Sequence, residues 1–251
     1  MKISARKIGF TLAEVLITLG IIGVVAAFTL PTVINNTRNL ELEAQLKKQY
    51  SDLNQISQLF MEHNGIAVPA YINKYGYTTF REEFYKYIKE VYKVSDWKYT
   101  DIGNPDKPMP YDMFTLKGNK LSSFGCDVTE FRIDVLGRYF SFDDPPKAGY
   151  NGPRICVDVN GSNKPNTVGL DIFYFIFTTD GFVIPEGQEH KNNNYESSKA
   201  GGGTVPASPA YCGKNGDHWA QATCGYYALI DKSPTGNGKY WKDFIGKKQY
   251  R

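Results

Sequence analysis

The sequence predicts an α+β fold, in which one long N-terminal helix packs against the antiparallel β-sheet of a head domain. Three observations support this prediction. Residues 10–30 form an apolar run long enough for a membrane-spanning helix, and residues 31–63 continue with apolar side chains at a helical period. Short apolar runs between turn residues follow, and the chain's 18 tyrosines and 15 phenylalanines suit half-buried strands.

The first element is the apolar run. Residues 10–30 read FTLAEVLITLGIIGVVAAFTL, and Glu14 is the only ionisable residue among them. At about 1.5 Å per residue, a helix of this length crosses a hydrocarbon core of about 30 Å. Three basic residues precede the run, so the N-terminus is expected in the cytoplasm and the rest of the chain outside. These residues are Lys2, Arg6 and Lys7.

The same three basic residues account for the formal net charge of +3. Removing them from the 29 basic residues leaves 26, which equals the number of acidic residues. The chain after this leader therefore lacks a general electrostatic attraction to DNA or RNA, and no nucleic-acid partner is expected. Lys247, Lys248 and Arg251 form a local basic tail, which we interpret as a solvated chain end.

Glu14 distinguishes between interpretations of the apolar run. A secretory signal peptide has a basic start, a short apolar run and a small-residue cleavage site, for which Val25-Ala26-Ala27 is a candidate. A plain signal anchor needs only the apolar run. Neither interpretation accounts for Glu14, because a carboxylate costs about 2.5–3.5 kcal/mol at the centre of a membrane and usually has a partner there.

The segment KIGFTLAEVLI, from Lys7 to Ile17, closely resembles the prepilin cleavage and methylation motif of type IV pilins and type II secretion pseudopilins. The resemblance implies that a membrane aspartyl peptidase cuts after Gly9, on the cytoplasmic side, and N-methylates Phe10 as the new first residue. It also implies that Glu14 neutralises the N-terminal amine of an adjoining subunit. Such a pair would align two subunits, because an unpaired charge at this depth is expensive.

The motif, the apolar run, the helical period and the cysteine count together predict a division of the chain into four parts. Residues 1–9 are the cleaved leader, residues 10–30 the transmembrane helix, and residues 31–64 its continuation into the head. Residues 65–251 form a pilin-like globular head whose C-terminal region is held by disulfides.

One helix is expected from Phe10 to about His63, kinked or locally melted near Gly20, Gly23 and Pro31. Its second half is expected to lay an apolar stripe on the head. The stripe consists of Leu42, Leu46, Tyr50, Leu53, Ile56 and Phe60.

In the head, a second helix is expected from Thr79 to Tyr92, with Thr79 and Glu82 as its capping box. Its apolar face would comprise Phe80, Phe84, Ile88 and Val91. Beyond it we expect a hairpin (residues 113–116 and 121–124), strands at residues 154–159, 170–178 and 182–184, and a loop at residues 190–210.

The segment from Asp158 to Asp171 contains a candidate calcium site. Asp158 and Asn160, followed by Gly161, are spaced as in loops that present oxygen ligands to calcium, and some pseudopilin heads are similar in binding calcium through such a loop. The candidate ligands are Asp158, Asn160 and Asp171. The alternative is an Asx-rich turn whose side chains bond the local backbone, without a cofactor.

The four cysteines are expected to form disulfides, because their even number lies on the outer side of a membrane. Local order favours Cys126–Cys156 and Cys212–Cys224, although three pairings are open. Zinc is the rival, because Cys212, His218 and Cys224 are evenly spaced; however, no CxxC pair is present.

No catalytic motif of the P-loop, G-x-S-x-G or HExxH kind is present, so we expect a structural protein and not an enzyme. The resemblance implies a subunit of a type II secretion pseudopilus or type IV pilus-like filament. Its partners would be prepilin peptidase, other pilin or pseudopilin subunits and an inner-membrane assembly platform. It would span the inner membrane once before entering the filament. The alternative is a membrane-tethered extracytoplasmic binding or enzymatic domain that uses a pilin-like anchor.

Overall fold

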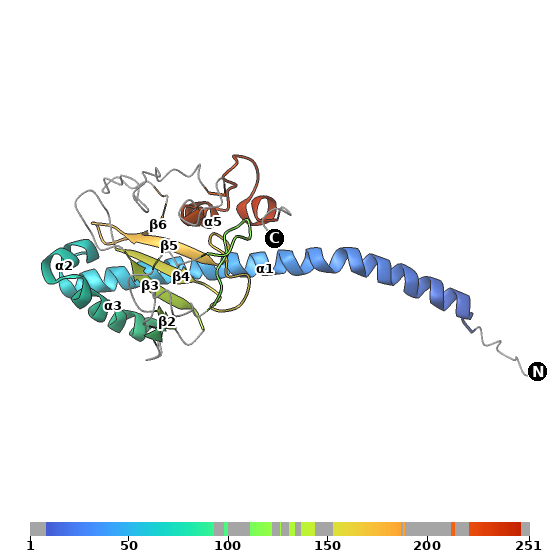
Figure 1. Cartoon of the computed structure of the whole chain (residues 1–251), viewed down its shortest axis with the longest axis horizontal. Helices are drawn as coiled ribbons and strands as arrows, with labels where there is room; N and C mark the ends of the chain where they lie inside the picture. Colours follow the sequence, from blue (N-terminus) through green and yellow to red (C-terminus); the bar gives the residue numbers. More distant parts are fainter. Residues whose placement is uncertain are drawn as a thin grey trace, which may run out of the picture. The chain divides into compact units, whose positions relative to one another are not determined.

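The computed structural model describes residues 9–92, 98–99, 111–121, 126, 131–133, 137–143, 153–186, 188, 212–213 and 221–246 (Figure 1). The chain divides into two compact units, Met1–Asn39 and Leu40–Arg251. Helix α1 (Leu12–Asn64) begins in the first unit and ends in the second. The long N-terminal helix and the antiparallel sheet confirm the predicted α+β fold.

Helix α1 is unbroken over its 53 residues. Of the two outcomes expected near Gly20, Gly23 and Pro31, local melting is wrong, because a proline removes a single helix hydrogen bond and the bonds on either side continue the helix. The kink stays a prediction. Within the described residues, α1 is the one helix whose length and composition would let it cross a membrane, and none of its most apolar window is buried in the protein.

The second half of α1 supplies the expected apolar stripe to the head. Tyr50 is half-buried and stacks against Phe175, with 6.1 Å between the ring centroids. The remaining members of the stripe are at most 2% exposed. They are Leu42, Leu46, Leu53, Ile56 and Phe60.

Two helices follow where one was expected, α2 (Val68–Tyr75) and α3 (Tyr77–Tyr92). Gly76 separates them with φ +87°, a conformation that glycine adopts without strain. Its carbonyl accepts the amide of Phe80, so α3 starts before Thr79 and the capping box predicted there is wrong. The expected apolar face is buried at Phe80, Phe84 and Ile88, whereas the side chain of Val91 lies outside the described set.

The sheet is an antiparallel meander whose six described strands follow one another in sequence order. Strands β4, β5 and β6 confirm three predicted strands, whereas β1, β2 and β3 were not predicted. The strands are β1 (Lys98–Tyr99), β2 (Phe131–Ile133), β3 (Tyr139–Asp143), β4 (Arg154–Asp158), β5 (Ile172–Phe177) and β6 (Val183–Pro185).

The predicted hairpin near residue 117 is reduced to a small turn. Phe114 and Lys120 form an isolated bridge, and the Leu121 amide donates to the Met113 carbonyl at 2.9 Å. Gly118 has φ +83° at its tip. Residues 122–124, which were to complete the second strand, lie outside the described ranges.

Both faces of the central strands are buried. On β5, Phe173, Phe175 and Phe177 belong to the core that includes α1 and α3, which cover one face of the sheet (Figure 1). Ile172 and Tyr174 point to the opposite face, where a second and smaller core forms. This second core also contains Met113, Cys126, Cys156, Val168 and Ala222.

The C-terminal region adds the short helix α5 (Cys224–Leu229) and the π-helix η3 (Tyr240–Phe244), neither of which was predicted. The Trp241 indole N–H donates to the Ala228 carbonyl at 2.9 Å, and the Tyr240 hydroxyl donates to the Gly169 carbonyl. The first bond joins η3 to α5, and the second joins η3 to the turn that precedes β5. The predicted loop at residues 190–210 and the basic tail lie outside the described part of the chain.

Candidate functional site

The N-terminal unit places Gly9, Phe10 and Thr11 ahead of the helix. Helix α1 begins at Leu12, so the peptide bond between Gly9 and Phe10 is not helical. The Phe10 side chain is 89% exposed, and nothing lies within 4 Å of the position that a Cβ on Gly9 would occupy. Among the described residues, nothing covers Gly9 or the Phe10 side chain.

Thr11 and Glu14 form a reciprocal capping box at the start of α1. The Thr11 amide and hydroxyl each donate to Glu14 Oε2 at 2.8 Å, and the Glu14 amide donates to Thr11 Oγ1 at 3.2 Å. Two amides that the helix cannot pair are thereby satisfied. Sequence reasoning missed the role of Thr11, although the T-x-x-E spacing is the signal that finds it.

The other polar groups of the apolar run are satisfied within the helix. The Thr18 hydroxyl donates to the carbonyls of Glu14 and Val15 at 2.9 and 3.0 Å, and the Thr29 hydroxyl donates to the Val25 carbonyl at 2.9 Å. Such internal bonds let a threonine enter an apolar environment at little cost. Glu14 is the one ionisable group in the run, and its Oε2 accepts both hydrogen bonds from Thr11.

The decisive comparison concerns this same segment. Residues 4–30 match the family model of the prokaryotic N-terminal methylation motif. The chain carries the prepilin-type motif of type IV pilin-like proteins. The motif implies processing by a prepilin peptidase and assembly with other pilins. It covers Gly9, Phe10 and Glu14 and stops before Pro31, so the match concerns the N-terminal segment and not the head. No curated protein and no solved structure matches the chain.

In the head, both disulfides link the pairs that local order favours. Cys126 pairs with Cys156 across 6.0 Å between Cα atoms, and Cys212 pairs with Cys224 across 4.9 Å. The zinc alternative is wrong, because a disulfide leaves neither Cys212 nor Cys224 free as a thiolate ligand. Its third member, His218, lies outside the described residues.

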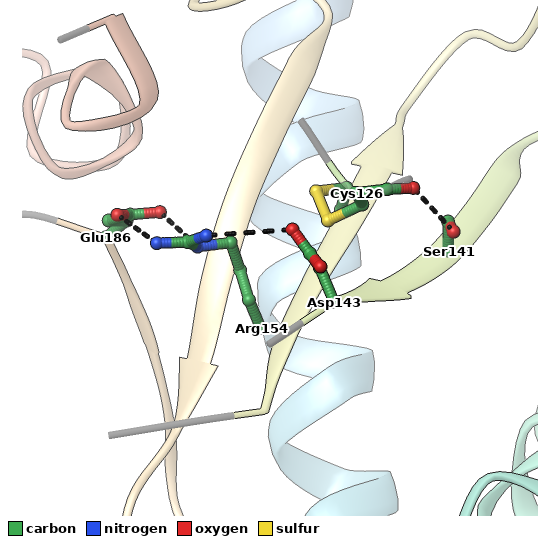
Figure 2. Close-up of a disulfide and its surroundings, with 6 residues drawn as sticks. Cys126, Ser141, Asp143, Arg154 and Glu186 are labelled. Atoms are coloured by element: carbon green, nitrogen blue, oxygen red, sulfur yellow. Dashed lines mark hydrogen bonds and ion pairs between the residues drawn. A yellow bond between two sulfur atoms is a disulfide. The ribbon is translucent and has the colours of Figure 1, made fainter. Parts of the chain in front are cut away.

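A buried ion triad lies on the same face of the sheet as the first disulfide (Figure 2). Arg154 on β4 contacts Glu186 through Nε at 2.8 Å and Nη2 at 2.9 Å, and its Nη1 lies 3.8 Å from Asp143 on β3. All three side chains are at most 3% exposed. Beside them, the Ser141 hydroxyl donates to the Cys126 carbonyl at 3.0 Å. The triad links β3, β4 and the residue after β6, and sequence patterns gave no sign of it.

The candidate calcium ligands hold a hydrogen-bonded loop together. The Tyr111 hydroxyl donates to Asp158 Oδ2 at 2.6 Å. Asp171 accepts the amides of Asn166 and Thr167 at 2.7 and 2.5 Å, one on each oxygen. Burial, together with repulsion from Asp171, raises the pKa of Asp158 well above its usual range. Burial also raises the pKa of Asp171 to about 7.

These residues do not fit a calcium site. Calcium takes six to eight oxygen ligands, whereas both oxygens of Asp171 and both oxygens of Asp158 already accept protein donors, the second Asp158 oxygen from the Asn160 amide at 3.3 Å. Asn160 keeps a buried Oδ1 that accepts no hydrogen bond, but this single amide oxygen falls far short of that number. Among the described residues, no three His, Cys, Asp or Glu side chains are grouped to hold a metal. The geometry favours the Asx-rich loop.

Proposed function

We propose that the chain is a structural subunit, a pseudopilin or minor pilin, of a type II secretion pseudopilus or a type IV pilus-like filament. The observation that carries this proposal is the N-terminal arrangement within the matched motif. An exposed Gly9–Phe10 bond precedes the helix, and the charged Glu14 lies four residues after Phe10, about one helical turn away.

Cleavage after Gly9 would leave an ammonium group on Phe10, which the peptidase would then methylate. The Glu14 carboxylate of one subunit would neutralise this amine in its neighbour, so that two helices align in register. Apolar side chains of the run would pack between subunits. Leu16, Ile17 and Ile22 are each more than 60% exposed in the single chain, and their burial would favour both membrane insertion and filament assembly.

The proposed role sets the location and the partners. Before assembly, α1 would anchor the chain in the inner membrane, with the N-terminus in the cytoplasm and the head outside. A prepilin peptidase, other pilin or pseudopilin subunits and an inner-membrane assembly platform would be its partners. A structural subunit of this kind needs no active site.

Assembly in a host with a complete filament system tests the proposal. Glu14→Gln removes the charge but keeps a side-chain oxygen that can accept the Thr11 amide, and we expect processed protein that does not enter filaments. Glu41→Gln is the matched control, because Glu41 is an exposed acid further along the same helix. Sheared filaments are quantified by immunoblotting against total protein. Normal filaments from Glu14→Gln would contradict the assembly role.

A further inference from the structure

A peptidase must bind the backbone on both sides of the bond that it cuts. A peptide bond within a helix is poorly available, because its N–H and C=O are paired along the helix axis and side chains surround it. Cleavage after Gly9 therefore requires that α1 begin on the C-terminal side of Phe10. In the structure it begins at Leu12, two residues beyond Phe10.

The start of α1 is determined locally. The first amides of any helix lack intrahelical partners, and they are satisfied either by a cap or by one more turn of helix. Near a membrane an additional turn of helix becomes more favourable, because little water is available to hydrogen-bond these amides. An additional turn ahead of Leu12 would include the Gly9–Phe10 bond.

The capping box of Thr11 and Glu14 satisfies the first amides of α1 without an additional turn of helix. Thr11 Oγ1 accepts the Glu14 amide, while Glu14 Oε2 accepts both the amide and the hydroxyl of Thr11. A residue that caps in this way has a non-helical backbone and marks the boundary of the helix. The same threonine is thus adjacent to Phe10 and fixes where the helix starts.

We propose that Thr11 is a positioning residue for precursor cleavage, because its capping box with Glu14 holds the Gly9–Phe10 bond outside the helix. This inference rests on the proposed processing by a prepilin peptidase. It assigns to the Thr11 hydroxyl a task that is separate from the charge pairing of Glu14 in assembly.

The test measures initial cleavage rates of the full-length precursor, in detergent micelles, by a purified prepilin peptidase. Thr11→Val keeps the shape of the side chain but removes the capping hydroxyl, and we expect a fall in rate of about five-fold, typical of a lost N-cap. Thr11→Ser and Thr11→Asp restore a capping oxygen and should restore the rate to within about two-fold of wild type.

Thr18→Val is the matched control. The Thr18 hydroxyl donates only to the carbonyls of Glu14 and Val15, so its loss leaves the capping box intact and the rate unchanged. Backbone chemical shifts of Gly9 and Phe10 in the same micelles should become more helical in Thr11→Val and remain unchanged in Thr18→Val.

The outcomes separate the inference from the proposed function. An equal or faster rate for Thr11→Val, with efficient cleavage of the wild type, overturns the positioning role and leaves the processing proposal intact. A wild-type precursor that the peptidase does not cut overturns both. A slow Thr11→Val that Thr11→Ser fails to rescue also contradicts the role of the hydroxyl.

Discussion

Asn54 on α1 forms two hydrogen bonds with the backbone of Val183 on β6. Asn54 Nδ2 donates to the Val183 carbonyl, and the Val183 amide donates to Asn54 Oδ1, both at 2.9 Å. Strand β6 is an edge of the sheet, and an unpaired edge is a site for unwanted association. The helix thereby covers the edge strand at this residue. The hydroxyl of Ser57, one turn further along α1, similarly donates to the Gly181 carbonyl at 2.8 Å.

Replacing Asn54 with leucine should destabilise the head by about 2–3 kcal/mol, because two backbone groups lose their partners. The free energy of unfolding of the purified protein, from urea titration, measures this effect. Gln55→Leu is the control, since Gln55 is the exposed neighbour on the same helix and should change stability by less than about 0.5 kcal/mol. Equal stabilities for the two variants would contradict the role of Asn54.

The ion triad makes a second prediction. Arg154→Met leaves the carboxylates of Asp143 and Glu186 buried without this guanidinium, and we expect a loss of about 3–5 kcal/mol. Lys120→Met removes an exposed ion pair with Asp112 and should cost less than about 1 kcal/mol. Both are measured by thermal and urea unfolding. A loss for Arg154→Met as small as that for Lys120→Met would show that the triad contributes little.

The buried carboxyls predict how stability depends on pH. Asp158 and Asp171 both have a raised pKa in the folded state, about 7 for Asp171. Between the unfolded value of about 4 and the folded value, the folded protein therefore binds more protons than the unfolded protein. Stability should fall as the pH rises through this range and level off above the folded pKa.

Asp158→Asn should flatten this pH dependence, because one of the two titrating groups is removed and the Tyr111 hydroxyl can turn to accept from the new amide. Unfolding free energies at a series of pH values measure the pH dependence. The same titrations with chelator and with excess calcium chloride show whether calcium stabilises the protein. A profile that rises with pH would contradict the assignment of the pKa shifts. A large gain with calcium would contradict the hydrogen-bonded loop.

Local patterns predicted a substantial part of this fold. The apolar run and the stripe from Leu42 to Phe60 predicted α1, because one helical face repeats regularly over many residues. The buried strands β4, β5 and β6 were found because each is a short apolar run between turn residues. The motif that contains Gly9, Phe10 and Glu14 was recognised because it lies within eleven consecutive residues, and residues 4–30 match its family model.

The features that sequence reasoning missed depend on distant partners or on a single backbone angle. Strand β3 pairs with β4 over five residues, and its buried Asp143 lies 3.8 Å from the guanidinium of Arg154 on that neighbouring strand. The start of α3 depends on the positive φ of Gly76, which the sequence does not reveal. The capping pattern at Thr79 therefore led to a helix start that is too late. The disulfide pairs were favoured by local order, but tertiary packing brings their Cα atoms into range, in the second core for Cys126–Cys156 and in the main core for Cys212–Cys224.

The most direct measurement of the central claim is the N-terminus of the protein expressed with and without a prepilin peptidase, by intact-mass and peptide mass spectrometry. A pilin-like precursor predicts a peptidase-dependent product that begins at N-methylated Phe10, and Gly9→Ala should abolish it. A chain that still begins at Met1 beside an active peptidase would contradict the account and indicate a simple signal anchor. A chain that begins at Phe28 would contradict it equally and indicate a secreted protein.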